Sequence, residues 1–120
     1  MTMRDHTKLR AFELADEVAL LTYRHTSNFP KAEQFGLTSQ MRRAAVSVPS
    51  NIVEGCARDS LADYLRFLDI AFGSLRELDY QLSLATRLGF VSSETELHAK
   101  VHETSKVLGA LIRSRRKPTA

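Results

Sequence analysis

The sequence predicts an all-α fold, an antiparallel up-down-up-down four-helix bundle with a proline-kinked second helix. Apolar residues recur every three or four positions in four separate stretches, and short breaks divide these stretches. The chain holds 5 glycines and 3 prolines in 120 residues, which is too few for a turn-rich all-β protein. No stretch alternates apolar and polar residues, and the sequence contains no Asn-Gly or Asp-Gly hairpin turn.

The first helix is expected from about Leu9 to Thr26. It should end before Asn28-Phe29-Pro30, because proline does not continue a helix and holds the residue before it in an extended conformation. A loop then leads to Gly36. The apolar residues of this helix form two neighbouring stripes, which comprise Phe12, Ala15 and Ala19, and Ala11, Leu14, Val18 and Leu21.

The second helix is expected to begin at an N-cap, Thr38, and to run to about Ala57. Pro49 lies inside it, where it removes one amide donor and frees the carbonyl group near Ala45. Because the apolar spacing continues across the proline, the sequence favours one kinked helix over two helices. The apolar face comprises Leu37, Met41, Ala44, Val48 and Ile52.

The third helix is expected to begin at the capping box Ser60-x-x-Asp63 and to end at Gly89, a residue suited to a left-handed position. The fourth should begin at a second capping box, Ser93-x-x-Glu96. Residues 1–112 are therefore predicted to form the bundle, and residues 113–120 a flexible basic tail. The apolar positions are Leu61, Tyr64, Leu68, Ala71, Leu75, Leu78, Leu82 and Ala85 in the third helix, and Leu97, Val101, Leu108 and Leu111 in the fourth.

The third helix is more apolar than a monomeric bundle requires. Its apolar arc exceeds half of the helical wheel, whereas a surface helix needs somewhat more than about 100°. Burial against another subunit would remove this surplus from water, so we expect self-association. The alternative is that the surplus residues are scattered on the surface, as single apolar residues often are. The surplus comprises Leu65, Phe72, Phe67, Ile70, Leu84 and Leu88.

The net charge of +3 is concentrated at the C-terminus. Of the 17 basic residues, four lie in the tail, which leaves 13 basic against 14 acidic residues in the body. A basic patch can favour nucleic acid or acidic partners, although a solvated tail gives the same net charge. The four tail residues are Arg113, Arg115, Arg116 and Lys117.

The sequence also indicates where the protein works. It has no apolar run of about 18 residues, and its N-terminus has no apolar core of a secretory signal. Its single cysteine, Cys56, has no partner for an internal disulfide. We therefore expect a cytoplasmic protein.

No motif points to an enzyme, a cofactor or a metal. His98-x-x-x-His102 has a spacing that can hold a metal ion, but a third ligand is missing and both histidines are expected to face solvent. Cys56 is interpreted as a small core residue, because nothing near it would favour a thiolate. No glycine-rich phosphate loop or paired general acid and base is recognisable. The sequence therefore predicts no small-molecule substrate, and neither catalytic nor cofactor residues.

The polar run from Ser47 to Gly55 is unusual for a helix interior. Beside Pro49, the side chains of Ser50 or Asn51 can bond backbone groups that the proline leaves unpaired. Glu54 is expected to meet Ser74 or an arginine across the bundle. We interpret these residues as a structural polar kink, and a polar ligand pocket at the kink is the alternative.

Arg42-Arg43 is the other basic pair of note. With Met41 facing the core, the two arginines should lie toward the flank of the second helix. They could bind phosphate or pair with carboxylates of another subunit. Together with the four tail residues, they form the predicted nucleic-acid contact.

Several of these motifs resemble the family of four-helix-bundle proteins encoded in intervening sequences of 23S ribosomal RNA genes. The similarity spans most of the chain, from the first helix to the fourth, and excludes the basic tail. Its longest block runs from Phe35-Gly36-Leu37-Thr38 through Gln40-Met41-Arg42-Arg43-Ala44-Ala45-Val46-Ser47-Val48-Pro49-Ser50-Asn51-Ile52 to Glu54-Gly55. The other matching segments are Phe29-Pro-x-x-Glu33, Ala71-x-Gly73-Ser74-Leu75-x-Glu77-Leu78 and Leu88-Gly89-Phe90.

The resemblance implies a bundle that assembles as a homopentamer. It also implies a distant similarity to accessory proteins of diversity-generating retroelements, which are pentameric bundles that bind nucleic acid and a reverse transcriptase. It supplies no catalytic residues. Two hypotheses for this chain follow. The first is a non-catalytic oligomer that binds RNA or DNA through phosphate contacts. The second is a protein–protein adaptor or assembly protein with no role in nucleic-acid binding.

Overall fold

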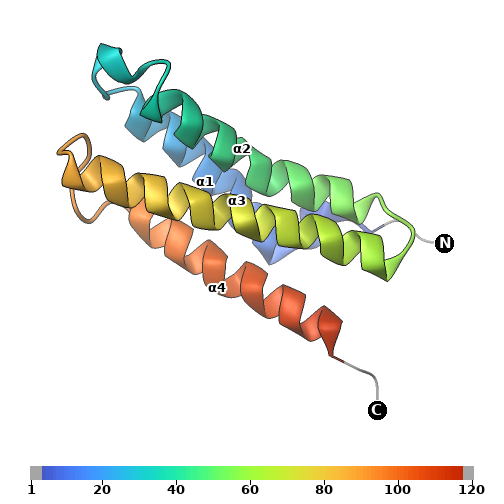
Figure 1. Cartoon of the computed structure of the whole chain (residues 1–120). Helices are drawn as coiled ribbons and strands as arrows, with labels where there is room; N and C mark the ends of the chain where they lie inside the picture. Colours follow the sequence, from blue (N-terminus) through green and yellow to red (C-terminus); the bar gives the residue numbers. More distant parts are fainter. Residues whose placement is uncertain (1–3, 118–120) are drawn as a thin grey trace.

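A computed structural model describes residues 4–117, which form four α-helices (Figure 1). The helices are α1 (Arg10–Thr26), α2 (Leu37–Cys56), α3 (Leu61–Arg87) and α4 (Glu96–Arg116). Two short 3-10 helices, η1 (His6–Lys8) and η2 (Lys31–Glu33), precede α1 and α2. No strand occurs in the described part of the chain, so the predicted all-α class is confirmed.

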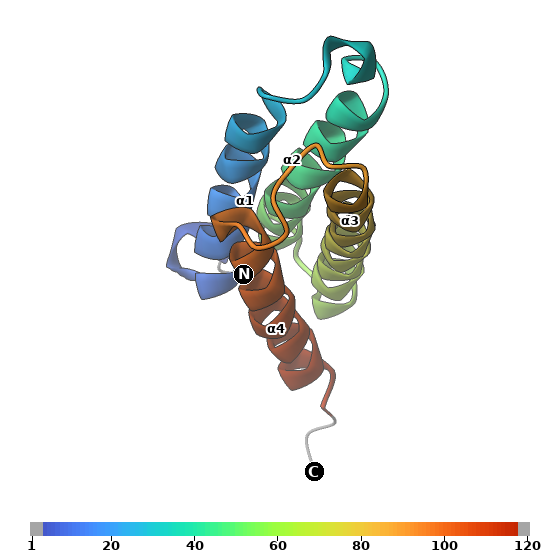
Figure 2. The ribbon, with the colours of Figure 1, turned by 90° about the vertical axis from the view of Figure 1, so that its left-hand side faces the viewer.

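Consecutive helices run in opposite directions and surround one core (Figures 1 and 2). Each helix packs on its neighbours in the chain, and α4 closes the bundle against α1. The core lies along the axis of a molecule that measures 50 × 23 × 19 Å. Its largest fully buried side chains are Tyr64, Leu14, Met41, Ile52, Leu68, Leu75, Leu78, Leu82, Leu97, Leu108, Val18 and Val48.

α3 begins and ends where the sequence predicts, but only one of the two hydrogen bonds of the predicted capping box is present. The Ser60 side chain accepts a hydrogen bond from the Asp63 amide (3.1 Å), which caps the first turn. At the other end Gly89 adopts a φ of 80°, a left-handed conformation that favours glycine. Local signals in the sequence therefore determine where the longest helix begins and ends.

The predicted caps of α2 and α4 are wrong. Glu33 accepts a hydrogen bond from the Leu37 amide (3.1 Å), so α2 begins at Leu37 and Thr38 is already inside it. At α4 the cap is Thr95 rather than Ser93, and the partner at the third helical position is His98. A carboxylate from the preceding turn and an imidazole can each bond a free amide, and neither follows the usual Ser-x-x-Glu pattern.

His98 is held at the corner between α3 and α4, and the prediction that it faces solvent is wrong. Its Nδ1 accepts a hydrogen bond from the Thr95 amide (3.1 Å). Its Nε2 lies 2.9 Å from Thr86 Oγ1, which donates to the Leu82 carbonyl. Because the Thr86 hydroxyl hydrogen is used in this way, Nε2 carries the proton and donates to Thr86. The ring is therefore neutral when the capping box is formed.

Unfolding should depend on pH through His98. Burial, with a smaller contribution from His25, lowers the pKa of the imidazole below its ordinary value of 6.5. The unfolded chain then binds this proton at higher pH than the native chain does. The contribution of neutral His98 to the free energy of unfolding is therefore full above about pH 6.5, and it is lost as the pH falls through the lowered pKa of the native chain. His98→Gln keeps a capping side chain and should flatten this dependence in urea titrations, whereas His102→Gln, at an exposed position, should keep it. An unchanged slope in His98→Gln would refute the assignment.

The residues around Pro49 show how a proline is accommodated. α2 is one continuous helix across Pro49, and the size of the bend there stays a prediction. Asn51 Nδ2 donates to the Ser47 carbonyl (2.8 Å) and to Ser47 Oγ (2.9 Å), so the prediction that Asn51 bonds backbone is confirmed. Ser50 is exposed. Glu54 forms an ion pair with Arg58, one turn along the chain, and not with Ser74 or an arginine across the bundle.

Asn51→Ala should therefore destabilise the protein by about 1–3 kcal/mol, because it removes both hydrogen bonds and leaves the half-buried Ser47 groups without this partner. Ser50→Ala, one position away on the surface, should change the free energy of unfolding by less than about 0.5 kcal/mol. Urea denaturation of both variants measures the difference. Equal midpoints for the two variants would show that the bonds do not stabilise the fold.

The predicted tail begins too early. α4 continues to Arg116, so residues 113–116 are helical, and only Lys117 of the described tail follows the helix. Arginines in the last turn interact favourably with the helix dipole, and Arg116 forms an ion pair with Asp69 on α3. The last three residues, 118–120, lie outside the described part of the chain.

The surplus apolar residues of α3 lie partly on the surface of the single chain. Ile70 is 41% exposed and Leu88 is 54% exposed, and Tyr80 on the same helix is 62% exposed. Phe67 is half-buried and lies beneath the guanidinium groups of two arginines. Leu65, Phe72 and Leu84 are half-buried against the core. The surplus therefore divides into residues that pack within the subunit and residues that do not.

Candidate nucleic-acid interface

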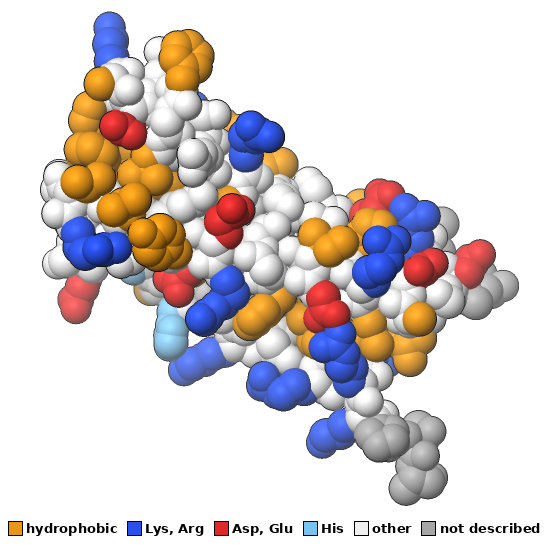
Figure 3. All heavy atoms as spheres, viewed as in Figure 1, with side chains coloured by type: hydrophobic (Ala, Val, Ile, Leu, Met, Phe, Trp, Pro, Cys, Tyr) orange, Lys and Arg blue, Asp and Glu red, His pale blue; other side chains and the backbone are white. Residues whose placement is uncertain are grey.

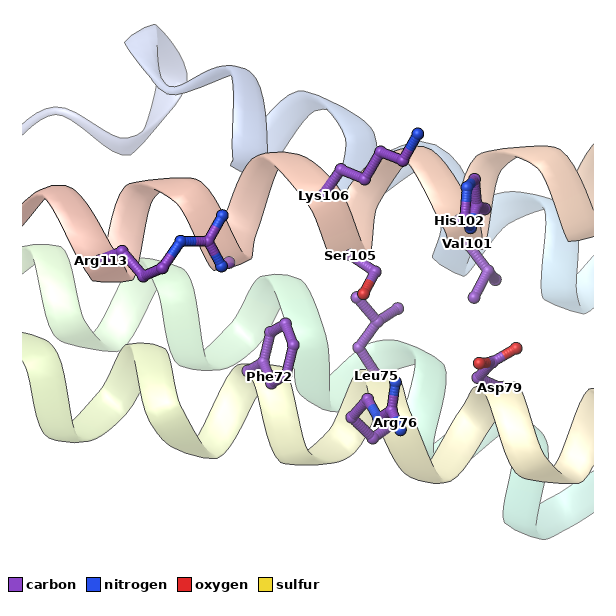
Figure 4. A pocket seen from close by; sticks show the side chains of 10 residues that line it. Phe72, Leu75, Arg76, Asp79, Val101, His102, Ser105, Lys106 and Arg113 are labelled. Atoms are coloured by element: carbon purple, nitrogen blue, oxygen red, sulfur yellow. The ribbon is translucent and has the colours of Figure 1, made fainter.

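A groove of about 330 Å³ runs between α3 and α4. Its floor is apolar, and polar and charged side chains line its rim (Figure 4). In this view Phe72, Leu75 and Asp79 project from α3, and Val101 and Ser105 project from α4. The remaining lining residues are Arg76, His102, Lys106, Gly109 and Arg113.

Small residues on α4 open the groove. Gly109 is buried, and a Cβ atom at this position would lie 3.3 Å from the Arg113 guanidinium and 3.5 Å from the Phe72 ring. Because the side chain is absent, Arg113 extends back along α4 toward Phe72 (Figure 4). The absence of a side chain at Gly109 therefore leaves room for the Arg113 guanidinium group above the apolar floor of the groove.

The rim of the groove is positively charged. It carries three permanent cations, Arg76, Lys106 and Arg113, against one carboxylate, Asp79. Among residues 4–117, none of the three cations has an ion-pair partner. Figure 3 shows Lys and Arg side chains along α4 and the adjacent flank of α3. Unpaired cations on a groove can bind an anion without first breaking an internal bond.

The structure divides the predicted contact residues between the two ends of the bundle. Arg113 lines the groove, and Arg115 and Lys117 are exposed where α4 ends. Arg116 is paired with Asp69. Because α2 and α4 both run antiparallel to α3, the first turns of α2 lie at the end of the bundle away from the C-terminus (Figure 1). Arg42 and Arg43 therefore do not join the Arg113–Lys117 segment in one patch of a subunit.

Arg42 serves the fold. Its Nε donates to Thr26 Oγ1 (2.9 Å), and its guanidinium group stacks on the Tyr23 ring at 4.6 Å. It thereby joins α2 to the end of α1. Arg43 is exposed and lines a different groove, between α2 and α3.

Sequence reasoning missed two cations of the α3–α4 groove, Arg76 and Lys106. Neither belongs to a run of basic residues. A signal was nevertheless present, because His102, Lys106 and Arg113 recur at four- and seven-residue intervals that place them on one face of a helix. Arg76 lies on the neighbouring helix, and a pattern within α4 does not reveal it.

The described residues offer little for other chemistry. Cys56 is buried, and burial raises the pKa of its thiol above the ordinary value, which disfavours the nucleophilic thiolate. Within residues 4–117, no three side chains of the types that bind metals gather closely enough to hold an ion. None of the helices in this part of the chain combines the length and the apolar character that a membrane crossing needs.

Comparison with known proteins gives a family and a fold. The family model described as 23S rRNA-intervening sequence protein matches residues 7–110. A crystal structure of a protein of unknown function from the S23 ribosomal protein family of Bacteroides thetaiotaomicron VPI-5482 is similar, with a TM-score of 0.76 and 25% sequence identity. The alignment covers 86% of this chain and 98% of that chain. No curated protein matches the chain.

Proposed function

Since the chain belongs to the 23S rRNA-intervening sequence protein family, we propose that it is a non-catalytic, oligomeric four-helix-bundle protein of the cytoplasm that binds nucleic acid through phosphate contacts. The observation that carries the proposal is the α3–α4 groove, where three unpaired cations face one carboxylate. The single cysteine, which is free and buried, fits a reducing compartment.

The groove fits a phosphate backbone better than it fits a base. Guanidinium groups bind phosphate oxygens in a bidentate manner, and a lysine adds a mobile point charge. The lining holds one imidazole, that of His102, and one phenylalanine, Phe72, which is half-buried and packs against the core. Phe72 does not offer the open ring face that base stacking requires. We therefore expect binding that depends little on nucleotide sequence.

Oligomerisation would supply affinity that one subunit lacks. The body of each chain is close to neutral, so one groove offers a polyanion only a few cations. In a homopentamer, which is the proposed assembly, five such grooves would act on one polyanion. Once one groove is bound, the effective concentration of phosphate at the next groove rises. Weak interactions repeated in this way give useful affinity.

The test measures fluorescence anisotropy of labelled RNA and labelled duplex DNA with the full chain in low-salt buffer. A groove variant carries Arg76→Gln, Lys106→Gln and Arg113→Gln, and it should bind at least about tenfold more weakly. The control variant has the same change in charge away from the groove and should bind like the wild type. It carries Lys8→Gln, Arg24→Gln and Lys31→Gln, all at exposed positions. Equal losses in both variants would assign binding to net charge rather than to the groove.

A second candidate function, a protein–protein adaptor, is favoured by Phe35. This residue is 91% exposed in the connection between α1 and α2, where a phenylalanine in water is unfavourable. A partner protein with an apolar pocket could bury it. If neither RNA nor DNA binds the intact protein in low salt, the adaptor function replaces the nucleic-acid function.

A further inference from the structure

A second groove, on the α2–α3 side of the bundle, has a different chemistry. It encloses about 420 Å³ and is lined from α2 by Gln40, Arg43, Ala44 and Ser47, and from α3 by Ser74, Glu77 and Gln81. On each helix the polar residues follow a three- and four-residue spacing, so both helices turn one polar face toward this space. The groove is independent of the α3–α4 groove and of the proposed function.

Gln81 is the main evidence that the α2–α3 groove binds a ligand. The residue is only 6% exposed, and its Oε1 is buried without a hydrogen-bond partner among residues 4–117. A buried carbonyl oxygen that has lost its water is unfavourable unless a donor replaces that water. The groove lined by Gln81 is where such a donor could enter.

The wall beside Gln81 is already ordered. Ser47 Oγ and Ser74 Oγ form a hydrogen bond of 2.8 Å between α2 and α3, and Asn51 donates to Ser47 from the next turn. Only one of the two serine hydroxyl groups donates in this bond. The hydrogen of the other hydroxyl group is therefore available to another acceptor. The wall therefore offers a fixed polar surface before any ligand arrives, which reduces the entropy lost on binding.

Two opposite charges also face this groove without neutralising one another. Arg43 comes from α2 and Glu77 from α3, and both side chains are exposed. Their charged atoms lie more than 4.0 Å apart, and neither has an ion-pair partner among residues 4–117. A ligand that carries both charges could satisfy both residues at once.

We propose that the α2–α3 groove binds a small zwitterion, a free α-amino acid. The carboxylate of the ligand pairs with Arg43, and its ammonium group donates to Glu77 and, once the Gln81 side chain turns toward the groove, to Gln81 Oε1. Glu77 disfavours a phosphate chain, because it places a negative charge at the opening. A single carboxylate also makes the groove a poor metal site, and the polar lining does not suit a lipid tail.

The experiment titrates the full-length protein with a panel of standard free L-amino acids at millimolar concentration, by isothermal titration calorimetry. At least one amino acid should bind saturably, and its N-acetyl and amide derivatives should bind at least about tenfold more weakly, because each removes one charge. Glu77→Gln and Arg43→Gln should each weaken binding by a similar factor. Glu94→Gln and Arg24→Gln, which lie outside the groove, should leave it unchanged.

Gln81→Met separates binding from folding. Methionine fills a similar volume and lacks the unpaired oxygen, so this variant should fold at least as stably as the wild type and still lose amino-acid affinity. If no amino acid binds the wild type, or if Gln81→Met binds as the wild type does, the proposal is wrong. The proposal would also be wrong if the α2–α3 groove were shielded from solvent in the assembled protein with no amino acid bound. That result would show that a second copy of the chain covers the groove.

Discussion

Replacing Gly55 with alanine should destabilise the protein by about 1–3 kcal/mol, although alanine ordinarily favours a helix over glycine. Gly55 lies in the last turn of α2, where the helix approaches α3 closely. A Cβ atom there would lie 2.9 Å from Phe67 Cβ and 3.3 Å from the Tyr64 carbonyl oxygen. Neither atom is the end of a flexible side chain, so α2 and α3 must move apart to admit the methyl group.

Gly73→Ala is the matched control. Gly73 lies inside α3, and a Cβ atom there would meet nothing within 4 Å. The same substitution should therefore stabilise the protein by roughly 0.5–1 kcal/mol, through helix propensity alone. Urea titration of the two variants measures effects of opposite sign. If Gly55→Ala is as stable as Gly73→Ala, the close approach of α2 and α3 at this position is wrong.

Light scattering of the purified protein should give a mass of about five times the 13.5 kDa of one chain. The physical basis is the exposed part of the α3 surplus, Ile70 and Leu88, together with Tyr80 on the same helix; these side chains remain in water in a single subunit. The number of subunits is the one implied by the family resemblance. A monomer at micromolar concentration would contradict the assembly, and another closed ring would contradict the number alone.

A charged substitution tests whether α3 provides the interface. Tyr80→Glu places a carboxylate at an exposed apolar position of α3 and should shift the protein toward smaller species, because a charge buried in an interface loses its hydration. Leu20→Glu makes a comparable change on α1, where the leucine is 52% exposed, and should leave the mass unchanged. Dissociation by Leu20→Glu alone would move the interface to α1.

The four helices could be predicted from the sequence because their signals are local. The apolar spacing of α3, the Ser60 cap and the left-handed Gly89 each depend on residues within a few positions of one another. The start of α2 was missed because the Glu33 side chain, an uncommon cap, bonds the Leu37 amide. The start of α4 was missed because the cap Thr95 is followed at the third helical position by His98, not by the usual Glu or Gln. The last helix also extends further than expected, and its final residue, Arg116, forms an exposed ion pair with Asp69 on α3.

The candidate site was less accessible to sequence reasoning. Clusters of adjacent arginines drew attention to Arg42, which the structure shows stacked on Tyr23 and bonded to Thr26. The α3–α4 groove instead combines Arg76 from one helix with Lys106 and Arg113 from another. Which residues of two helices face one another depends on their relative rotation. A single sequence shows which residues share a face of each helix, but it does not show which faces of two helices lie next to each other.

The dependence of nucleic-acid affinity on salt tests most directly whether the α3–α4 groove binds phosphate. On duplex DNA, log Kobs should fall linearly with log salt concentration, and each neutralised phosphate contributes about −0.9 to the slope. The variant with Arg76→Gln, Lys106→Gln and Arg113→Gln should give a flatter line, by about 0.9 for each phosphate that the variant no longer neutralises. The Lys8→Gln, Arg24→Gln and Lys31→Gln control should keep the wild-type slope. Parallel lines for the wild type and the groove variant would contradict phosphate binding in this groove.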